Sequence, residues 1–208
     1  MIRNLVFDLG NVLLSWNPGD YLIKSGFSEE RTKLILDTVF KSSEWLSLDN
    51  GDISKDEAIE RMASGSSLKR AEISSLFDLC IDILYPITSN VKLLPALKKR
   101  GYRLYYLSNY PIDFFLATKS RYSFFDFFDG GIISAEVRFS KPDPEIYNIL
   151  LGRYGLNAGE SLFIDDIYEN VEAAISVGMK GLFTGGNHNI ASALCKIINC
   201  PEAVTGKI

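Results

Sequence analysis

The chain has 208 residues, of which 47% are hydrophobic and 23% are charged, and its formal net charge is −4. This composition is typical of a globular protein with one domain, or with one domain that carries an insertion, and it excludes a disordered or collagen-like chain. The densest basic run is Lys98-Lys99-Arg100, so we expect neither nucleic acid nor an acidic membrane surface as a partner.

Three cysteines (Cys80, Cys195 and Cys200) form no C-x-x-C pair, and the single histidine, His188, lies in a turn-like GGNHN segment. We therefore expect no disulfide framework, no zinc site and no Ser–His–Asp chemistry. Asp8 interrupts the apolar start of the chain, and no long apolar stretch follows, so neither a leader nor a membrane span is expected. The default expectation is a cytoplasmic monomer.

Five short apolar runs are predicted to be buried strands, namely residues 2–7, 102–107, 131–134, 161–164 and 180–184. Helix-length segments precede three of the last four runs: residues 89–101, 141–155 and 169–177. Alternation of this kind predicts an α/β fold with a Rossmann-like parallel sheet between two layers of helices. Pro95 lies inside the first helical segment, which must therefore start late or kink.

The first strand breaks this rhythm, because the segment that follows it is far too long for a loop. It has helical character over residues 29–41, 54–62 and 68–84. We therefore predict a small helical bundle inserted into the sheet domain. The expected division is a core domain of residues 1–15 and 86–208 and a helical cap of residues 16–85.

Ligands of an open parallel sheet bind beyond the carboxyl ends of its strands. Polar side chains stand at each of these positions: Asp8 after the first strand, Ser108 and Asn109 after the second, Lys141 before the third crossover helix, and Asp165 and Asp166 after the fourth, with Asn170 one turn later. The sequence therefore predicts that these groups converge on one edge of the sheet.

Such a cluster suits the handling of a phosphoryl group. Neighbouring carboxylates repel each other unless a cation lies between them, and oxygen donors without His or Cys favour Mg²⁺. Asp8 could attack phosphorus to form an aspartyl-phosphate, while the metal and Lys141 neutralise the phosphoryl oxygens and Ser108 with the Asn109 amide holds one of them.

Each motif alone also has an ordinary explanation. Asp8 and Ser108-Asn109 could be turn residues, the KPDP segment could start a helix, and Asp165-Asp166 could cap one. It is the order of the four motifs, each at the same end of its strand or crossover, that favours a functional site.

The motifs FDLGNV, LYYLSN, KPDPEIY and FIDDIYEN together resemble those of the haloacid dehalogenase-like hydrolase superfamily, over residues 2 to 184. Gly10 and the segment from Ser43 to Ser54 are most similar to the branch that holds sugar-1-phosphate phosphatases and the N-terminal phosphatase domain of soluble epoxide hydrolases. The resemblance implies a helical cap and a Mg²⁺-dependent phosphatase for a small phosphorylated metabolite, such as a sugar phosphate.

The resemblance also implies residue roles. Asp8, Ser108 and Lys141 would be catalytic, and Ser108, Asn109 and Lys141 would bind the phosphate. Asp8, the Gly10 carbonyl and Asp166 would bind the metal directly. Asp165 would act through water or on Lys141, and Asn170 would support the metal shell.

One departure from the family pattern concerns the leaving group. Family phosphatases usually carry a second Asp two residues after the nucleophile, where this chain has Gly10, and the loss of a positioned acid slows a reaction by ~10²–10⁴. An easily expelled leaving group, such as an anomeric oxygen, would compensate. So would a cap acid, Glu44 or Asp49, and a third possibility is a slow enzyme.

Two other functions stay open. One is a metal-independent 2-haloacid dehalogenase, which would use Asp8 on carbon but would have no use for the acidic pair. The other is a non-catalytic phosphate-binding or regulatory protein on the same fold. Trp16 and Trp45 either face the substrate or pack within the cap.

Overall fold

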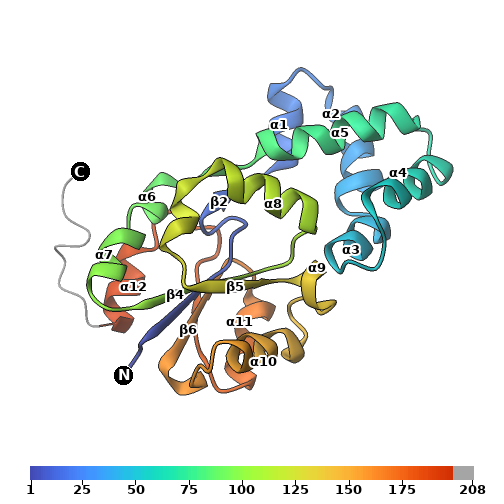
Figure 1. Cartoon of the computed structure of the whole chain (residues 1–208). Helices are drawn as coiled ribbons and strands as arrows, with labels where there is room; N and C mark the ends of the chain where they lie inside the picture. Colours follow the sequence, from blue (N-terminus) through green and yellow to red (C-terminus); the bar gives the residue numbers. More distant parts are fainter. Residues whose placement is uncertain (199–208) are drawn as a thin grey trace.

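The structure is a computed structural model and describes residues 1–198. Five parallel strands form the sheet in the order β5-β4-β1-β6-β7: β1 (Asn4–Phe7), β4 (Arg103–Ser108), β5 (Gly130–Ile133), β6 (Ser161–Asp165) and β7 (Lys180–Phe183). All five predicted strands are present. The order places β1 at the centre, between β4 and β6, where its carboxyl end is flanked on both sides (Figure 1).

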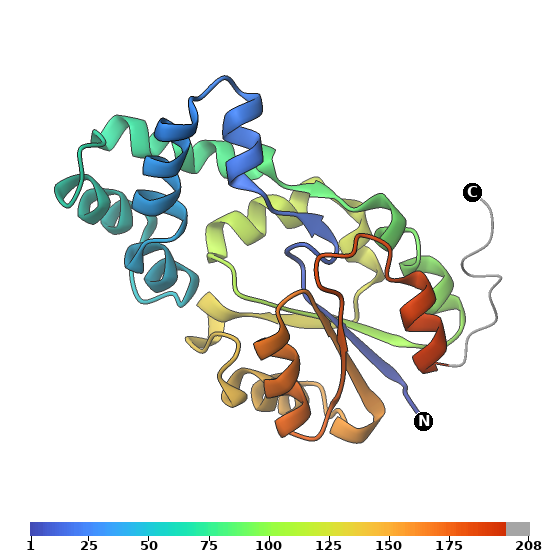
Figure 2. The same ribbon diagram turned by 180° about the vertical axis from the view of Figure 1, so that it is seen from behind.

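Helices cover both faces of this sheet, as the alternation predicts. Val6 faces α10 (Pro144–Arg153) and α11 (Tyr168–Ser176), while Leu5 and Phe7 face the opposite layer. That layer contains α7 (Leu94–Lys99), α8 (Ile112–Arg121) and α12 (Ala191–Ile198). The period of two along β1 thus builds two hydrophobic cores, one on each face of the sheet. Figure 2 shows α10 and α11 below the sheet.

The helix expected over residues 89–101 is divided into two. It consists of α6 (Thr88–Val91) and α7, and Pro95 lies in the first turn of α7. Proline is tolerated there because the amide that it lacks has no partner inside the helix in any case. The remaining short elements are η2 (Ser123–Phe127), α9 (Ser134–Val137) and η3 (Ala158–Glu160).

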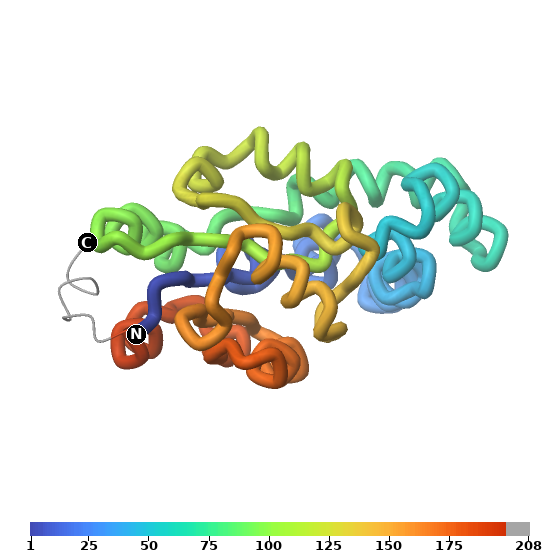
Figure 3. Tube along the Cα trace, turned by 60° about the horizontal axis from the view of Figure 1, so that its bottom comes forward, coloured from blue at the N-terminus to red at the C-terminus, as the bar shows by residue number. Residues whose placement is uncertain are grey.

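The segment after β1 is helical, as predicted. A two-stranded antiparallel ribbon of β2 (Leu14–Ser15) and β3 (Tyr85–Pro86) carries five α-helices and one π-helical turn: α1 (Pro18–Lys24), α2 (Glu29–Ile35), η1 (Leu36–Phe40), α3 (Ser43–Asp49), α4 (Lys55–Ser64) and α5 (Arg70–Ile83). These elements lie beyond one end of the sheet, away from the N-terminus (Figures 1 and 3). We call them the cap. The exact division at residues 16 and 85 stays a prediction.

Side-chain caps fix where four of the cap helices begin. Asn17, Ser28, Ser42 and Ser54 each accept a hydrogen bond from the backbone amide three residues later. Caps of this kind satisfy amide groups that the helix leaves without partners. The helix α3, which the sequence analysis did not predict, begins in this way at Ser42 and ends at the sheet domain.

Within the described residues, none of the helices combines the length and the apolar character needed to cross a membrane. Cys80 and Cys195 are both buried, and Cys200 lies outside the described residues.

Candidate active site

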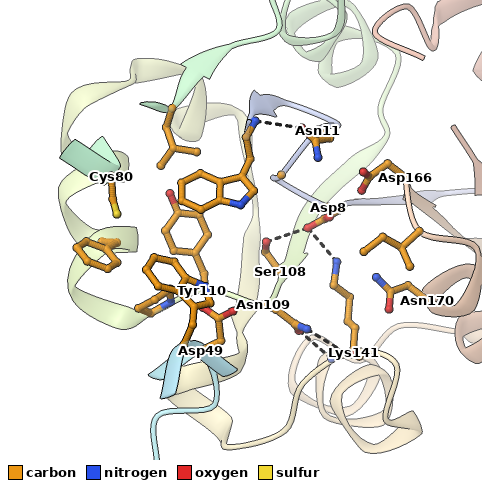
Figure 4. Close-up of a pocket in the computed structure, with 17 residues that line it drawn as sticks. Asp8, Asn11, Asp49, Cys80, Ser108, Asn109, Tyr110, Lys141, Asp166 and Asn170 are labelled. Carbon is orange, nitrogen blue, oxygen red and sulfur yellow. Dashed lines mark hydrogen bonds and ion pairs between the residues drawn. The ribbon is translucent and has the colours of Figure 1, made fainter. Parts of the chain in front are cut away.

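Asp8 directly follows the central strand β1 and lies at the floor of a pocket (Figure 4). Its Oδ1 atom accepts three hydrogen bonds, from the Leu9 amide at 2.7 Å, the Ser108 hydroxyl at 2.8 Å and the Lys141 ammonium at 2.9 Å. The hydrogen bonds to this carboxylate from described residues all end on Oδ1. The second oxygen, Oδ2, is therefore the one available for chemistry.

Lys141 lies between two carboxylates. Its Nζ atom is 2.9 Å from Asp8 Oδ1 and 2.6 Å from Asp165 Oδ2, and its side chain is 2% exposed. Burial alone would lower the pKa of the ammonium, but the charges of Asp8 and Asp165 outweigh it and raise that pKa. Lys141 therefore stays protonated and holds the two carboxylates together.

The Asn109 side chain forms hydrogen bonds with the backbone of Lys141. Its side-chain amide donates to the Lys141 carbonyl at 2.9 Å, and its Oδ1 accepts from the Lys141 amide at 2.8 Å. Both ends of the amide are thus used to fix the loop that carries the lysine. The predicted phosphate contact of the Asn109 amide stays a prediction, although the residue does line the pocket.

The acidic pair divides into two different environments. Asp165 is fully buried, and it accepts hydrogen bonds from Lys141, from the Ile167 amide at 2.8 Å and from the Asn170 side chain at 3.2 Å. Asp166 is only partly buried and lines the pocket. This difference favours Asp166 as a direct metal ligand and Asp165 as the partner of Lys141 and Asn170.

Asp8, Asp165 and Asp166 each offer an oxygen within 4.8 Å of the oxygens of the other two. Magnesium binds oxygen ligands at about 2.0–2.1 Å, so ligands on opposite sides of one ion lie about 4 Å apart. The triad thus has the donor type and the spacing to hold a hard cation. Gly10 lines the same pocket, beside Asp8.

Burial and charge also affect the carboxyl groups themselves. Burial raises the pKa of Asp8 to about 7, with a further rise from Asp165 that Lys141 opposes. Burial also raises the pKa of Asp166, and a hydrogen bond from Asn11 opposes the rise. A divalent cation beside these groups would favour their ionised forms.

Aromatic side chains dominate the opposite side of the pocket, where Asp49 and Tyr110 are polar exceptions. The cavity has a volume of about 180 Å³, with Asp8, Ser108, Lys141 and Asp166 on one side and an apolar wall on the other. Trp45 forms the centre of this wall, stacked between Trp16 at 5.9 Å and Phe114 at 6.1 Å between ring centroids. Both tryptophans therefore line the pocket and pack against each other, and their contact with a substrate stays a prediction.

The second family acid is absent at Gly10, but the space for it exists. A Cβ atom added at Gly10 meets no heavy atom within 4 Å, and its φ angle lies outside the left-handed region. Of the two cap acids named from the sequence, Asp49 lines the pocket, whereas Glu44 accepts a hydrogen bond from the neighbouring Ser43 instead.

Some residues that line the pocket were not named as candidates from the sequence. Asn11, Tyr110 and Phe114 line the cavity, but they were not among the candidates. Asn11 lies within the FDLGNV motif and Tyr110 directly follows LYYLSN, so position in or next to a motif was the available signal for these two residues. Phe114 belongs to α8, whose orientation is set by tertiary packing.

A sequence model described as haloacid dehalogenase-like hydrolase matches residues 2–178. The chain belongs to this hydrolase family. The sesquiterpene phosphatase astK of Aspergillus oryzae is 31% identical to it over 94% of this chain and 96% of the relative. Bifunctional epoxide hydrolase 2 of Mus musculus is 28% identical over 91% of this chain, which spans 34% of that longer protein.

Solved structures also resemble this haloacid dehalogenase-like hydrolase. A predicted HAD-like hydrolase from Porphyromonas gingivalis has a TM-score of 0.74 and is 25% identical, over 95% of this chain and 98% of the other. A HAD family enzyme from Bacteroides thetaiotaomicron, in complex with magnesium and inorganic phosphate, has a TM-score of 0.68 and is 25% identical, over 88% and 94%. The family resemblance and the α/β fold predicted from the sequence are both confirmed.

Proposed function

We propose that this hydrolase is a Mg²⁺-dependent phosphomonoester hydrolase that acts through an aspartyl-phosphate on Asp8. The observation that carries the proposal is the arrangement around Asp8. One oxygen is held by Ser108 and Lys141, the other is left for attack, and two further carboxylates lie within reach of a shared ion. The phosphatases among its relatives support the same function.

Asp8, the Gly10 carbonyl and Asp166 would hold the metal ion, with Asp165 and Asn170 behind them. When bound, the ion supplies positive charge to the phosphoryl oxygens and favours the ionised form of Asp8. A relative of similar fold binds magnesium and phosphate together, which supports magnesium as the ion.

Residues of the chain carry out the attack on phosphorus and the stabilisation of the transition state. Asp8 Oδ2 attacks phosphorus in line with the bond to the leaving oxygen, and the phosphoryl group passes to Asp8 as the alcohol departs. The Lys141 ammonium and the Ser108 hydroxyl stabilise the charge on the phosphoryl oxygens. Water then attacks the aspartyl-phosphate and releases inorganic phosphate and free Asp8.

The apolar wall favours an ester with an apolar organic group. Beyond the phosphate-handling side chains the cavity is bounded mainly by aromatic side chains, among them Trp16, Trp45 and Phe114, and Asp49 is the acid on that side. The relative named a sesquiterpene phosphatase supports this substrate class, and a sugar phosphate is the alternative to compare.

A panel of phosphate esters tests the proposal, assayed with Mg²⁺ and with a chelator. We expect turnover with Mg²⁺ only, and kcat/KM should rise about fourfold for each methylene along an alkyl phosphate series, because burial of a CH₂ contributes ~0.8 kcal/mol. Asp8→Asn should lower kcat by at least ~10⁴. Turnover of 2-haloacids in the chelator, or an active Asp8→Asn protein, would contradict the mechanism. Faster turnover of glucose 1-phosphate than of any alkyl phosphate would overturn the substrate class.

A further inference from the structure

The proposed mechanism needs a proton for the leaving oxygen, and none of the residue roles described above supplies it. An alkyl phosphate expels an alkoxide, which is a poor leaving group unless an acid protonates it as the P–O bond breaks. The usual position for that acid is Gly10, which carries no side chain. The acids that line the pocket among the described residues are Asp8, Asp166 and Asp49. The first two belong to the group of three carboxylates that could hold a metal ion, so Asp49 is the acid that remains.

Asp49 occupies the side of the pocket where the leaving group must lie. Asp8 lies just beyond the carboxyl end of the central strand β1. In-line attack therefore directs the leaving oxygen away from Asp8 and toward the cap. Asp49 is the last residue of the cap helix α3. In Figure 4 it lies on the opposite side of the pocket from Asp166 and Asn170.

We propose that Asp49, supplied by the cap, is the general acid that protonates the leaving oxygen in place of the side chain absent at Gly10. The inference rests on the proposed phosphatase function. Asp49 gives its proton to the leaving oxygen, so the alcohol departs neutral and Asp49 becomes a carboxylate. In the second half-reaction, the attacking water gives a proton back to Asp49, which restores the starting state.

Contacts with the sheet domain hold Asp49 in this position. The Ser134 hydroxyl donates to the backbone carbonyl of Asp49, and the Ser134 Oγ accepts from the Tyr110 amide at 2.9 Å. The Ser140 hydroxyl donates to the Asn50 side chain. The end of α3 is thus bound to both the α9 segment and the loop before Lys141, so the acid is placed only when the cap is docked.

The surroundings of Asp49 suit an acid that is protonated near neutral pH. Burial raises its pKa to about 7, while a hydrogen bond from the Trp45 indole opposes the rise. Cys80 and Tyr110 share the pocket, and burial raises the pKa of each, so both are neutral there. The elements packed against α3 carry charged groups that are paired with other side chains. In α4, Lys55 is paired with Asp78, Arg61 with Glu57, and Asp56 and Glu60 with Arg70. Glu136 of α9 is paired with Arg153, and Asp37 of η1 with Lys33.

Leaving-group dependence separates an acid from a structural residue. Butyl phosphate needs protonation of its leaving oxygen, whereas 4-nitrophenyl phosphate expels a stable phenolate and needs little. We expect Asp49→Asn to lower kcat for butyl phosphate by ~10²–10⁴ and for 4-nitrophenyl phosphate by less than about tenfold. Glu44→Gln changes the other acid of α3, which does not line the pocket. It is the matched control and should change neither rate.

A second experiment introduces an aspartate at position 10, where family phosphatases usually carry their acid. Asp49→Asn combined with Gly10→Asp should recover at least about tenfold of the lost butyl phosphate activity, because position 10 has room for the side chain. In the wild-type protein kcat for butyl phosphate should fall as the pH rises through about 7, since the acid then loses its proton. That fall should be absent from Asp49→Asn.

Equal losses on both substrates, or no loss in Asp49→Asn, would overturn the inference. Failure of the proposed function itself would look different, because the wild-type protein would then hydrolyse neither ester in the presence of Mg²⁺.

Discussion

At the scale of single residues, the site depends on one ammonium between two buried carboxylates. Lys141 contacts Asp8 and Asp165 at 2.9 and 2.6 Å, with almost none of its side chain exposed. Charges this deeply buried are tolerated only when they are paired. Lys141 therefore stabilises the fold by pairing with the two carboxylates, whether or not phosphate is bound.

Removal of this ammonium should destabilise the protein. Lys141→Met leaves two buried carboxylates without a cation and should lower the free energy of unfolding by about 3–5 kcal/mol in a chelator. Added Mg²⁺ should restore part of the loss, because a cation in the triad again separates the charges. Urea denaturation at pH 7.5 measures both quantities.

The matched control is Lys33→Met, whose ammonium is paired with Asp37 on the surface and whose side chain is 82% exposed. It should change the free energy of unfolding by less than about 1 kcal/mol. A Lys141→Met protein as stable as this control would contradict the assigned arrangement of charges.

The sequence predicted which residues would lie near the site better than it predicted the contacts between them. Asp8, Ser108 and Lys141 were predictable because each stands beside the end of a strand or the start of a helix, and the parallel sheet brings those ends together. The use of the Asn109 amide on the Lys141 backbone was not predictable, because it depends on the relative path of two loops.

At the scale of elements, α3 links the cap to the catalytic edge of the sheet. The seven residues of α3 were not predicted as a helix, although Ser42 is a residue type that caps helices and Glu44 is an acid in the first turn. Gly51, just beyond α3, has a φ angle of +74°, and a Cβ atom there would lie 2.5 Å from the Ala135 carbonyl oxygen. The close approach of α3 to α9 thus requires glycine at this position.

Gly51→Ala should therefore push the end of α3 away from α9 and displace Asp49. We expect kcat for butyl phosphate to fall by at least about tenfold, as for a partly lost general acid, with a smaller effect on 4-nitrophenyl phosphate. Gly26→Ala is the control, since Gly26 also has a positive φ angle but no atom within 4 Å of the added Cβ. Equal effects of the two substitutions would show that backbone strain, and not the contact with α9, is responsible.

At the scale of the whole molecule, both the cap and the sheet domain contribute residues to the pocket. The sheet supplies charged groups, and the cap supplies Trp16, Trp45 and Asp49. The insertion was predictable because the segment after β1 is too long for a loop. The identity of its pocket-facing residues was not, since apolar side chains that pack and those that line a cavity have the same sequence pattern.

Trp16→Ala tests the apolar side of the pocket. Trp16 is partly exposed and stacks on Trp45, so its removal should lower kcat/KM for octyl phosphate by about tenfold, equivalent to ~1.4 kcal/mol of lost apolar contact. The effect on ethyl phosphate should be smaller. Tyr85→Ala changes an exposed aromatic residue of β3, which pairs with Ser15 beside Trp16, and should leave both values unchanged. A uniform loss on both esters in Trp16→Ala would contradict an apolar subsite at this wall.

The stereochemical course at phosphorus tests the central claim most directly. A substrate made chiral at phosphorus with oxygen isotopes undergoes two in-line displacements if Asp8 attacks first, so the account predicts overall retention of configuration when one isotope comes from water. Direct attack by water would give inversion, and that result would contradict the proposed role of Asp8.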